Sequence, residues 1–143
     1  MRADGVQTTT VPNEFWRIVS GKSVCEIQDG GRCVTDGNGN YGNNENCEVM
    51  ALKPLVVTAE YYDVEKNYDY VTIKGIKYRS YGPNQVNMGK SQTWTWRSDG
   101  SNNRPGFKLC ASTGCDINLV ALPCIYICVH VCMYLCMYVF MYV

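Results

Sequence analysis

The chain has 143 residues, of which 46% are hydrophobic and 18% charged, and its Lys and Arg residues equal its Asp and Glu residues in number, at 13 each. A chain of this length fits one globular domain with terminal extensions, and it leaves little room for two domains. Because the net charge is zero and no block of like charge is long, the sequence predicts no nucleic-acid-binding arm.

The first stretch, "MRADGVQTTTVPNEF", lacks the apolar segment of a secretory signal peptide. We expect residues 1–14 to be an unstructured lead, followed by a domain at residues 15–112. Since the cysteines described below favour an oxidising compartment, we expect that either the true N-terminus is missing or the chain is one piece of a longer extracellular protein.

Short alternating segments separated by turn clusters make up the middle of the chain. In chain order, "YVTIKG", "TWTWRSDG" and "GFKLC" alternate apolar and polar side chains with a period of two, which is typical of strands with one buried face. Clusters rich in Gly and Asn interrupt the chain at "QDGGR", "TDGNGNYGNN", "YGPN" and "SDGSNNRPG". The pattern predicts an all-β protein, an antiparallel β-sandwich or barrel.

Nine cysteines fall into two sets. Cys25, Cys33, Cys47 and Cys110 lie in the polar, turn-rich part, where they indicate a disulfide framework formed in an oxidising compartment. Four cysteines allow three pairings, and their spacing does not choose among them. The spacing also matches no zinc finger or zinc ribbon, so we expect no metal cluster of the Cys/His type.

The other cysteines lie in a hydrophobic tail at residues 113–143, which carries no charged residue from position 117 onward. The run "LPCIYICVHVCMYLCMYVFMYV" is long enough, at about 1.5 Å per helical residue, to cross a membrane as a single helix. This interpretation makes the chain a membrane-anchored extracellular domain. The alternative is a low-complexity repeat of the units "CMYL", "CMYV" and "FMYV", which would make the tail an artefact of the gene model.

Catalytic motifs are missing from the sequence. It contains no His-Glu-x-x-His and no Gly-x-Ser-x-Gly, and the only histidine, His130, lies in the tail. We therefore do not expect an enzyme.

Three stretches resemble a CUB domain in content and order: "CVTDGNGNYGNNENCEV", then "LVVTAEYYDVEKNYDYVTIKG", then "WTWRSDGSNNRPGFKLC". The resemblance covers roughly residues 15–111. Its most specific pieces are the run at residues 68–71, "YDYV", and the pair Ser98 and Asp99 followed by Gly106 and Phe107. It implies an extracellular, non-enzymatic β-sandwich of jelly-roll type that binds other molecules.

The resemblance also implies a metal site. In the calcium-binding members of the family, acidic side chains from two loops at one end of the sandwich hold Ca²⁺. The matching residues here are Glu65, Asp69 and Asp99, with the Tyr41 hydroxyl as a supporting hydrogen bond. Three carboxylates with carbonyl groups and water can supply the roughly six to eight oxygen ligands that Ca²⁺ takes. Such a site would let the acids accept a Lys or Arg side chain of an extracellular partner protein.

The alternative for this acidic run is a solvated edge. Glu60, Asp63, Glu65 and Asp69 could be surface charges, some of which discourage edge-to-edge pairing of strands.

Two disulfide pairings follow from the same comparison. The first bridge of the family resembles Cys25 to Cys47, which leaves Cys33 and Cys110 as a second pair. A Cys33 to Cys47 bridge with Cys25 to Cys110 is the alternative.

A second function comes from the aromatic residues. Trp94 and Trp96 share one face of a strand, so we expect them in the core. Tyr78 and Tyr81 could instead form an exposed face with the neighbouring cations, a possible site for stacking on sugars or binding anionic glycans; those cations include Lys77 and Arg79. The alternative to a calcium-organised protein-binding module is therefore a metal-independent glycan-binding or structural adhesion sandwich.

Overall fold

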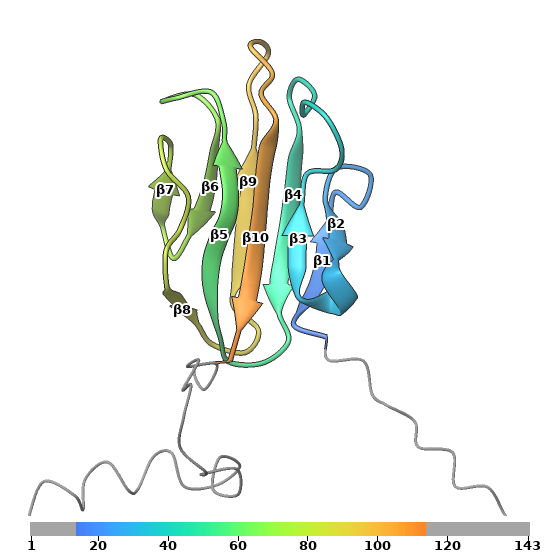
Figure 1. Cartoon of the computed structure of the whole chain (residues 1–143), viewed down its shortest axis with the longest axis vertical. Coiled ribbons are helices and arrows are strands. Elements are labelled where there is room, and N and C mark those ends of the chain that lie inside the picture. Colours follow the sequence, from blue (N-terminus) through green and yellow to red (C-terminus); the bar gives the residue numbers. More distant parts are fainter. Residues whose placement is uncertain (1–13, 114–143) are drawn as a thin grey trace, which may run out of the picture. The chain divides into compact units, whose positions relative to one another are not determined.

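The computed structural model describes residues 14–113, in which ten strands form two antiparallel five-stranded sheets (Figure 1). The two sheets pack face to face, so the antiparallel β-sandwich expected from the sequence is confirmed. The lead and the tail lie outside the described residues, apart from Glu14 and Thr113. Within residues 14–113, no helix has the length and apolar character that a membrane crossing requires.

Sheet 1 contains, in spatial order, β1 (Trp16–Ser20), β4 (Asn46–Ala51), β9 (Thr93–Arg97), β6 (Tyr70–Ile73) and β7 (Ile76–Tyr78). Sheet 2 contains β2 (Glu26–Gln28), β3 (Cys33–Thr35), β10 (Gly106–Ser112), β5 (Leu55–Asp63) and β8 (Val86–Met88). A single 3₁₀ turn, η1 (Asp29–Gly31), joins β2 to β3. The three strands expected from alternating patterns are confirmed as β6, β9 and β10.

The core forms where alternate side chains of the two sheets meet. In β9 the side chains of Trp94 and Trp96 point inward and are 1% and 0% exposed, which confirms their expected core position. Both rings pack against Phe107 of β10, with ring centroids 5.8 and 5.1 Å apart. These aromatic contacts join the central strand of sheet 1 to the central strand of sheet 2.

Residues 14–113 contain two disulfides, Cys25 to Cys47 and Cys33 to Cys110. Cys25 and Cys47 belong to the core cluster, whereas Cys33 and Cys110 are direct register partners on the neighbouring strands β3 and β10. The pairing implied by the CUB resemblance is confirmed, and the alternative pairing is wrong. The alternative fails because the register of β3 and β10 places Cys33 opposite Cys110.

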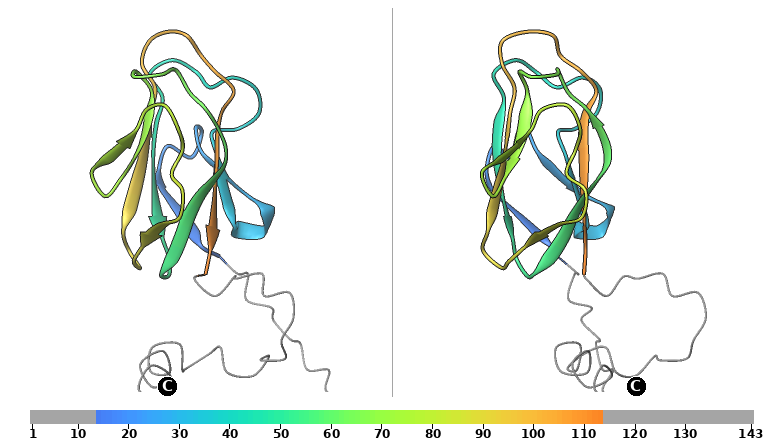
Figure 2. Two further views of the ribbon diagram at one scale, coloured as in Figure 1. Left: turned by 60° about the vertical axis from the view of Figure 1, so that its left-hand side comes forward. Right: turned by 90° about the vertical axis from the view of Figure 1, so that its left-hand side faces the viewer.

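Three loops gather at one end of the sandwich, away from the end where the described chain begins and finishes (Figures 1 and 2). They join β3 to β4, β5 to β6, and β9 to β10. Glu65 and Asp69 lie in the second of these loops and Asp99 in the third, so the fold brings these three acids to one end of the sandwich.

Candidate metal centre

Three carboxylates meet at the loop end. Glu65 and Asp69 come from the β5–β6 loop and Asp99 from the β9–β10 loop, and each offers an oxygen within 4.8 Å of the others. The structure thus brings together all three residues that the sequence pointed to. We call these three residues the acidic group.

The β5–β6 loop is a tight turn that places Glu65 and Asp69 on the same side. The amides of Tyr68 and Asp69 both donate to the carbonyl oxygen of Glu65, at 3.2 and 3.1 Å. Asn67 adopts the left-handed conformation, with φ of +75°, which Asn tolerates better than most residues. The three residues between Glu65 and Asp69 are therefore enough to reverse the chain.

Asp69 is the buried centre of the acidic group, with 0% of its surface exposed. Its Oδ1 accepts the backbone amide of Asp99 at 2.7 Å, and its Oδ2 accepts the hydroxyl of Tyr41. A buried carboxylate is tolerated only when it is paired in this way. For Asp69, the prediction of a solvated edge charge is therefore wrong.

Tyr41 supports the acidic group from the β3–β4 loop. Besides donating to Asp69, its hydroxyl oxygen accepts the backbone amide of Glu65 at 2.9 Å. Its ring packs edge-on against Trp96, with centroids 5.1 Å apart, so the core fixes its position. Burial, followed by the hydrogen bond to Asp69, raises the pKa of Tyr41, which keeps the phenol protonated and donating.

Glu65 carries a buried oxygen that lacks a partner. Its Oε1 accepts the side-chain amide of Asn102 at 2.8 Å, whereas its Oε2 is buried and has no hydrogen-bond partner within residues 14–113. A buried carboxylate oxygen left unpaired costs about 1–3 kcal/mol or more. A cation beside Oε2 would remove this cost, so the residues present fit a hard metal ion.

Ser98 joins the β9–β10 loop to the β3–β4 loop by hydrogen bonds. Its hydroxyl donates to the carbonyl of Gly42 at 2.7 Å and accepts the amide of Glu45 at 2.9 Å. The amide of Asn44 also donates to the carbonyl of Asp99 at 2.6 Å. Sequence reasoning marked Ser98 as part of a motif, and the structure shows why a buried hydroxyl is needed beside Asp99.

The remaining residues of the acidic run lie apart from this group. Glu60 has a side chain that is 58% exposed and pairs with Lys108 at 3.2 Å, and Asp63 ends β5 opposite Gly106. For Glu60, the prediction of a surface charge is confirmed.

Asp36 and Glu45 are acidic residues that sequence reasoning missed. Asp36 Oδ1 accepts the backbone amide of Phe107 at 2.8 Å, while Asp36 Oδ2 and Glu45 Oε2 are buried without a partner in the described part of the chain. Burial raises the pKa of Asp36 to about 6. The stretch "TDGNGN" indicates a turn, and no local signal shows that its Asp accepts a hydrogen bond from the start of β10.

The predicted aromatic face is only partly exposed. Tyr81 is 75% exposed, but Tyr78 is 9% exposed and belongs to the core cluster, so its placement on an exposed face is wrong. The two predicted cations surround a different ring: Lys77 Nζ and the guanidinium of Arg79 lie 4.6 and 5.2 Å from the centroid of Tyr70. Tyr78 is buried because the third residue of β7 points inward, opposite Val71.

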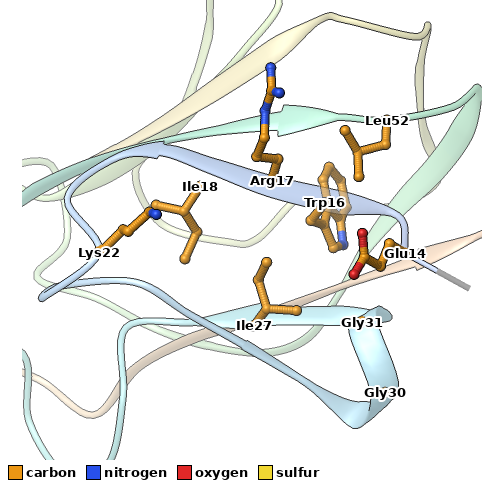
Figure 3. A pocket seen from close by; sticks show the side chains of 9 residues that line it. All are labelled: Glu14, Trp16, Arg17, Ile18, Lys22, Ile27, Gly30, Gly31 and Leu52. Carbon is orange, nitrogen blue, oxygen red and sulfur yellow. The ribbon is translucent and has the colours of Figure 1, made fainter. Parts of the chain in front are cut away.

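A separate pocket of about 550 Å³ lies between β1 and β2, the edge strands of the two sheets (Figure 3). Its apolar lining includes Trp16, Ile18 and Ile27, and charged residues at its margin are Glu14, Arg17 and Lys22. No member of the acidic group lines it, so the pocket and the candidate metal centre are different places on the molecule.

Comparisons with family models, with curated proteins and with solved structures find no match to this chain. The CUB resemblance therefore rests on the residues described above and stays a prediction.

Proposed function

We propose that the protein is an extracellular binding module that recognises a partner protein through a loop end organised by Ca²⁺. The observation that carries the proposal is the buried, unpartnered Oε2 of Glu65 within a group of three carboxylates. The two disulfides favour an oxidising, extracellular compartment.

Each residue of the proposed calcium site has its own role. Glu65, Asp69 and Asp99 would hold the ion, while Tyr41 and the amide of Asp99 orient the Asp69 carboxylate. Bound Ca²⁺ would supply positive charge to carboxylates that otherwise repel one another. Because Glu65 and Asp99 are partly exposed, they can also accept a Lys or Arg side chain of a partner protein.

A thermal melt of the oxidised full chain, with millimolar Ca²⁺ or with a chelator, tests this proposal. A ligand at a hundred times its Kd stabilises the folded state by about 2.7 kcal/mol, which raises Tm by several degrees. We expect Asp99→Asn to abolish this increase, since the amide keeps an acceptor for the Ser101 amide and removes the charge.

Asp63→Asn is the matched control, because it neutralises a nearby residue of the same acidic run that lies outside the acidic group. We expect this variant to keep the full effect of Ca²⁺. Equal melting temperatures with saturating Ca²⁺ and with chelator would overturn the proposal.

A second candidate function, binding of an anionic glycan, is favoured by the surroundings of Tyr70. Lys77, Arg79 and Arg97 all lie beside its ring or hydroxyl, and no ion pair joins them to a carboxylate within residues 14–113. The hydrogen bond from Lys77 to the hydroxyl, at 3.3 Å, lowers the pKa of Tyr70. This group of cations is suited to a sulfated or carboxylated sugar.

Retention on a heparin column checks the second candidate. Lys77→Gln with Arg79→Gln should elute at lower salt than Lys22→Gln with Lys90→Gln, which removes the same net charge elsewhere. Equal elution of the two double variants would show that any retention reflects net charge alone.

A further inference from the structure

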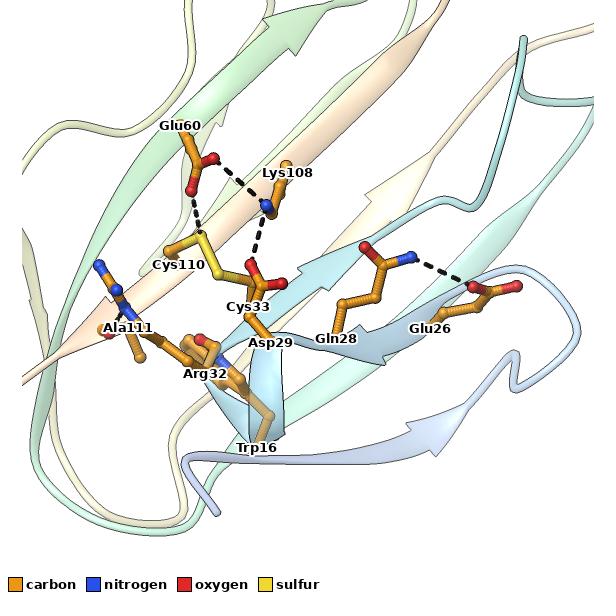
Figure 4. Close-up of polar contacts among 10 residues, drawn as sticks. All are labelled: Trp16, Glu26, Gln28, Asp29, Arg32, Cys33, Glu60, Lys108, Cys110 and Ala111. Carbon is orange, nitrogen blue, oxygen red and sulfur yellow. Dashed lines mark hydrogen bonds and ion pairs between the residues drawn. A yellow bond between two sulfur atoms is a disulfide. The ribbon is translucent and has the colours of Figure 1, made fainter. Parts of the chain in front are cut away.

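The Cys33 to Cys110 disulfide lies on the outer face of sheet 2 with two carboxylates beside it (Figure 4). Asp29 of η1, Cys33 of β3, Glu60 of β5 and Cys110 of β10 each offer a ligand atom, and these four atoms lie within 4.8 Å of one another. We call these residues the sulfur–carboxylate cluster. Three adjacent strands and a turn supply these residues, so the spacing of the four ligands along the sequence does not reveal the cluster.

Backbone irregularities direct both carboxylates toward the sulfurs. The register of β5 against β10 shifts between Lys108 and Leu109, which pair with Tyr61 and Ala59, so Glu60 is the extra residue of a β-bulge. Asp29 adopts a left-handed conformation with φ of +52° at the start of η1. Both side chains thus lie over the disulfide and outside the core cluster.

The cluster already attracts positive charge. Lys108 Nζ lies 2.8 Å from Asp29 Oδ2 and 3.2 Å from Glu60 Oε1. The contact with Asp29 and, to a smaller extent, the contact with Glu60 raise the pKa of Lys108. The carboxylates remain open to solvent, since the side chains of Asp29 and Glu60 are 50% and 58% exposed. A metal ion could therefore reach the two carboxylates from outside and compete with the ammonium group, while Cys33 and Cys110 lie buried beneath them, 1% and 7% exposed.

Glu60 also contacts a sulfur directly. Its Oε2 lies 3.2 Å from Sγ of Cys110, and a disulfide sulfur carries no hydrogen to donate. The carboxylate oxygen of Glu60 therefore lies next to the Cys110 sulfur without receiving a hydrogen bond from it. Once that sulfur is a thiolate, the oxygen and the sulfur could both bind one ion.

We propose that reduction of the Cys33 to Cys110 disulfide converts the sulfur–carboxylate cluster into a zinc site. A dithiol reductant supplies two electrons and two protons, so the S–S bond breaks, two cysteine thiols form, and the dithiol becomes a cyclic disulfide. Zn²⁺ then displaces the two thiol protons and takes two thiolates and two carboxylates. Four ligands of this kind suit the tetrahedral preference of Zn²⁺, whereas thiolates do not suit Ca²⁺.

Zinc binding would favour the reduced state by linkage. Because the ion binds the reduced form, a free zinc concentration a hundred times the Kd raises the ratio of reduced to oxidised protein about a hundredfold. The site would thus report both thiol reduction and zinc. It does not depend on the calcium proposal, since the two sites share no residue.

The test uses the full chain in which the cysteines and the histidine of the tail are replaced, so that they cannot compete for zinc. Cys115, Cys124, Cys128, Cys132 and Cys136 are changed to Ser, and His130 to Gln. The protein is reduced with a phosphine, which becomes the phosphine oxide. A separate sample is alkylated, and peptide mapping of that sample shows that Cys33 and Cys110 are reduced. Zinc affinity is then measured by competition with a coloured chelator, and Co²⁺ serves as a probe of thiolate coordination by its charge-transfer absorption.

We expect one zinc per reduced chain and none in the oxidised chain. The double variant Cys33→Ser with Cys110→Ser should lose binding, and Glu60→Gln and Asp29→Asn should each weaken it at least about tenfold. Lys108→Met should tighten binding, because it removes the competing ammonium; a merely structural salt bridge predicts no such gain.

Equal zinc binding by the double serine variant would overturn the proposal, as would Co²⁺ spectra without a thiolate band. Reduced protein is also followed by circular dichroism. A reduced chain that unfolds and does not regain β-structure when zinc is added would overturn the proposal as well.

Discussion

The hydroxyl of Tyr41 donates a hydrogen bond to the carboxylate of Asp69, and both side chains are almost fully buried. The same hydroxyl accepts the amide of Glu65, so one phenol bridges two members of the acidic group. This relationship links the core to the candidate metal centre, because the Tyr41 ring packs on Trp96.

Tyr41→Phe is expected to destabilise the protein by about 1–3 kcal/mol, since it leaves a buried carboxylate oxygen and a partly buried amide without a partner. It should also weaken Ca²⁺ binding by releasing Asp69 from its orientation. Urea unfolding with and without Ca²⁺ measures both effects.

Tyr62→Phe is the matched control for this change. Its hydroxyl donates to the carbonyl of Tyr78 at 2.6 Å and accepts the amide of Val71 at 3.1 Å, so it bridges backbone groups instead of carboxylates. A similar loss of stability with an unchanged effect of Ca²⁺ is expected. If both variants lost the same fraction of Ca²⁺ stabilisation, Tyr41 would have no special role.

Gly106→Ala is expected to be more damaging than Gly75→Ala. Both glycines have positive φ, +92° and +78°, and a left-handed conformation costs a non-glycine residue about 1–2 kcal/mol. A Cβ at Gly106 would also collide with the Asp36 carboxylate, whereas a Cβ at Gly75 meets nothing within 4 Å.

The collision should add about 1–3 kcal/mol to the loss at Gly106. Denaturant unfolding of the two variants isolates this contribution, because backbone strain is common to both. Equal losses would mean that Asp36 moves aside freely and does not hold the start of β10.

Local patterns were sufficient to predict three of the ten described strands, β6, β9 and β10, and the core position of two tryptophans. Alternation at Trp94 and Trp96 identifies β9 because a strand buries every second side chain wherever it lies in the sheet. The acidic group required more: Glu65 and Asp69 are close in sequence, but only the family resemblance pointed to Asp99, and no pattern showed that Asp69 would be buried.

Features that depend on long-range pairing escaped prediction. Asp36 accepts the amide of Phe107, 71 positions away, only because β3 pairs with β10. Glu60 lies beside Cys110 because of a β-bulge, which a pattern of period two does not reveal. Tyr78 faces inward because the register of β7 on β6 places it opposite the buried Val71, and a shift of that register by one residue would turn it outward.

The contribution of Asp36 to the stability of the protein is expected to fall as pH rises from about 4 to about 6. Burial raises the pKa of Asp36 from 3.8 to about 6, so the folded state holds a proton that the unfolded state has already lost in this range. The stabilising effect of the proton is complete below the unfolded pKa and is lost as pH rises through the folded pKa.

The interval between these two pKa values corresponds to at most about 3 kcal/mol. The true effect is smaller, because part of the Asp36 side chain reaches solvent, which screens its charge. Asp36→Asn keeps an oxygen that can accept the Phe107 amide and removes the charge near Glu45. It should therefore stabilise the protein at pH 7.5 and have little effect at pH 4.

Urea unfolding at several pH values between 4 and 7.5, with chelator present to exclude metal binding, measures this difference. Glu26→Gln controls for net charge, because it neutralises an exposed acid on β2 of the same sheet. A constant difference between Asp36→Asn and the parent protein across the whole range would mean that the buried carboxylate is ionised throughout. In that case the unpaired Oδ2 of Asp36 would have to find a cation or water as its partner.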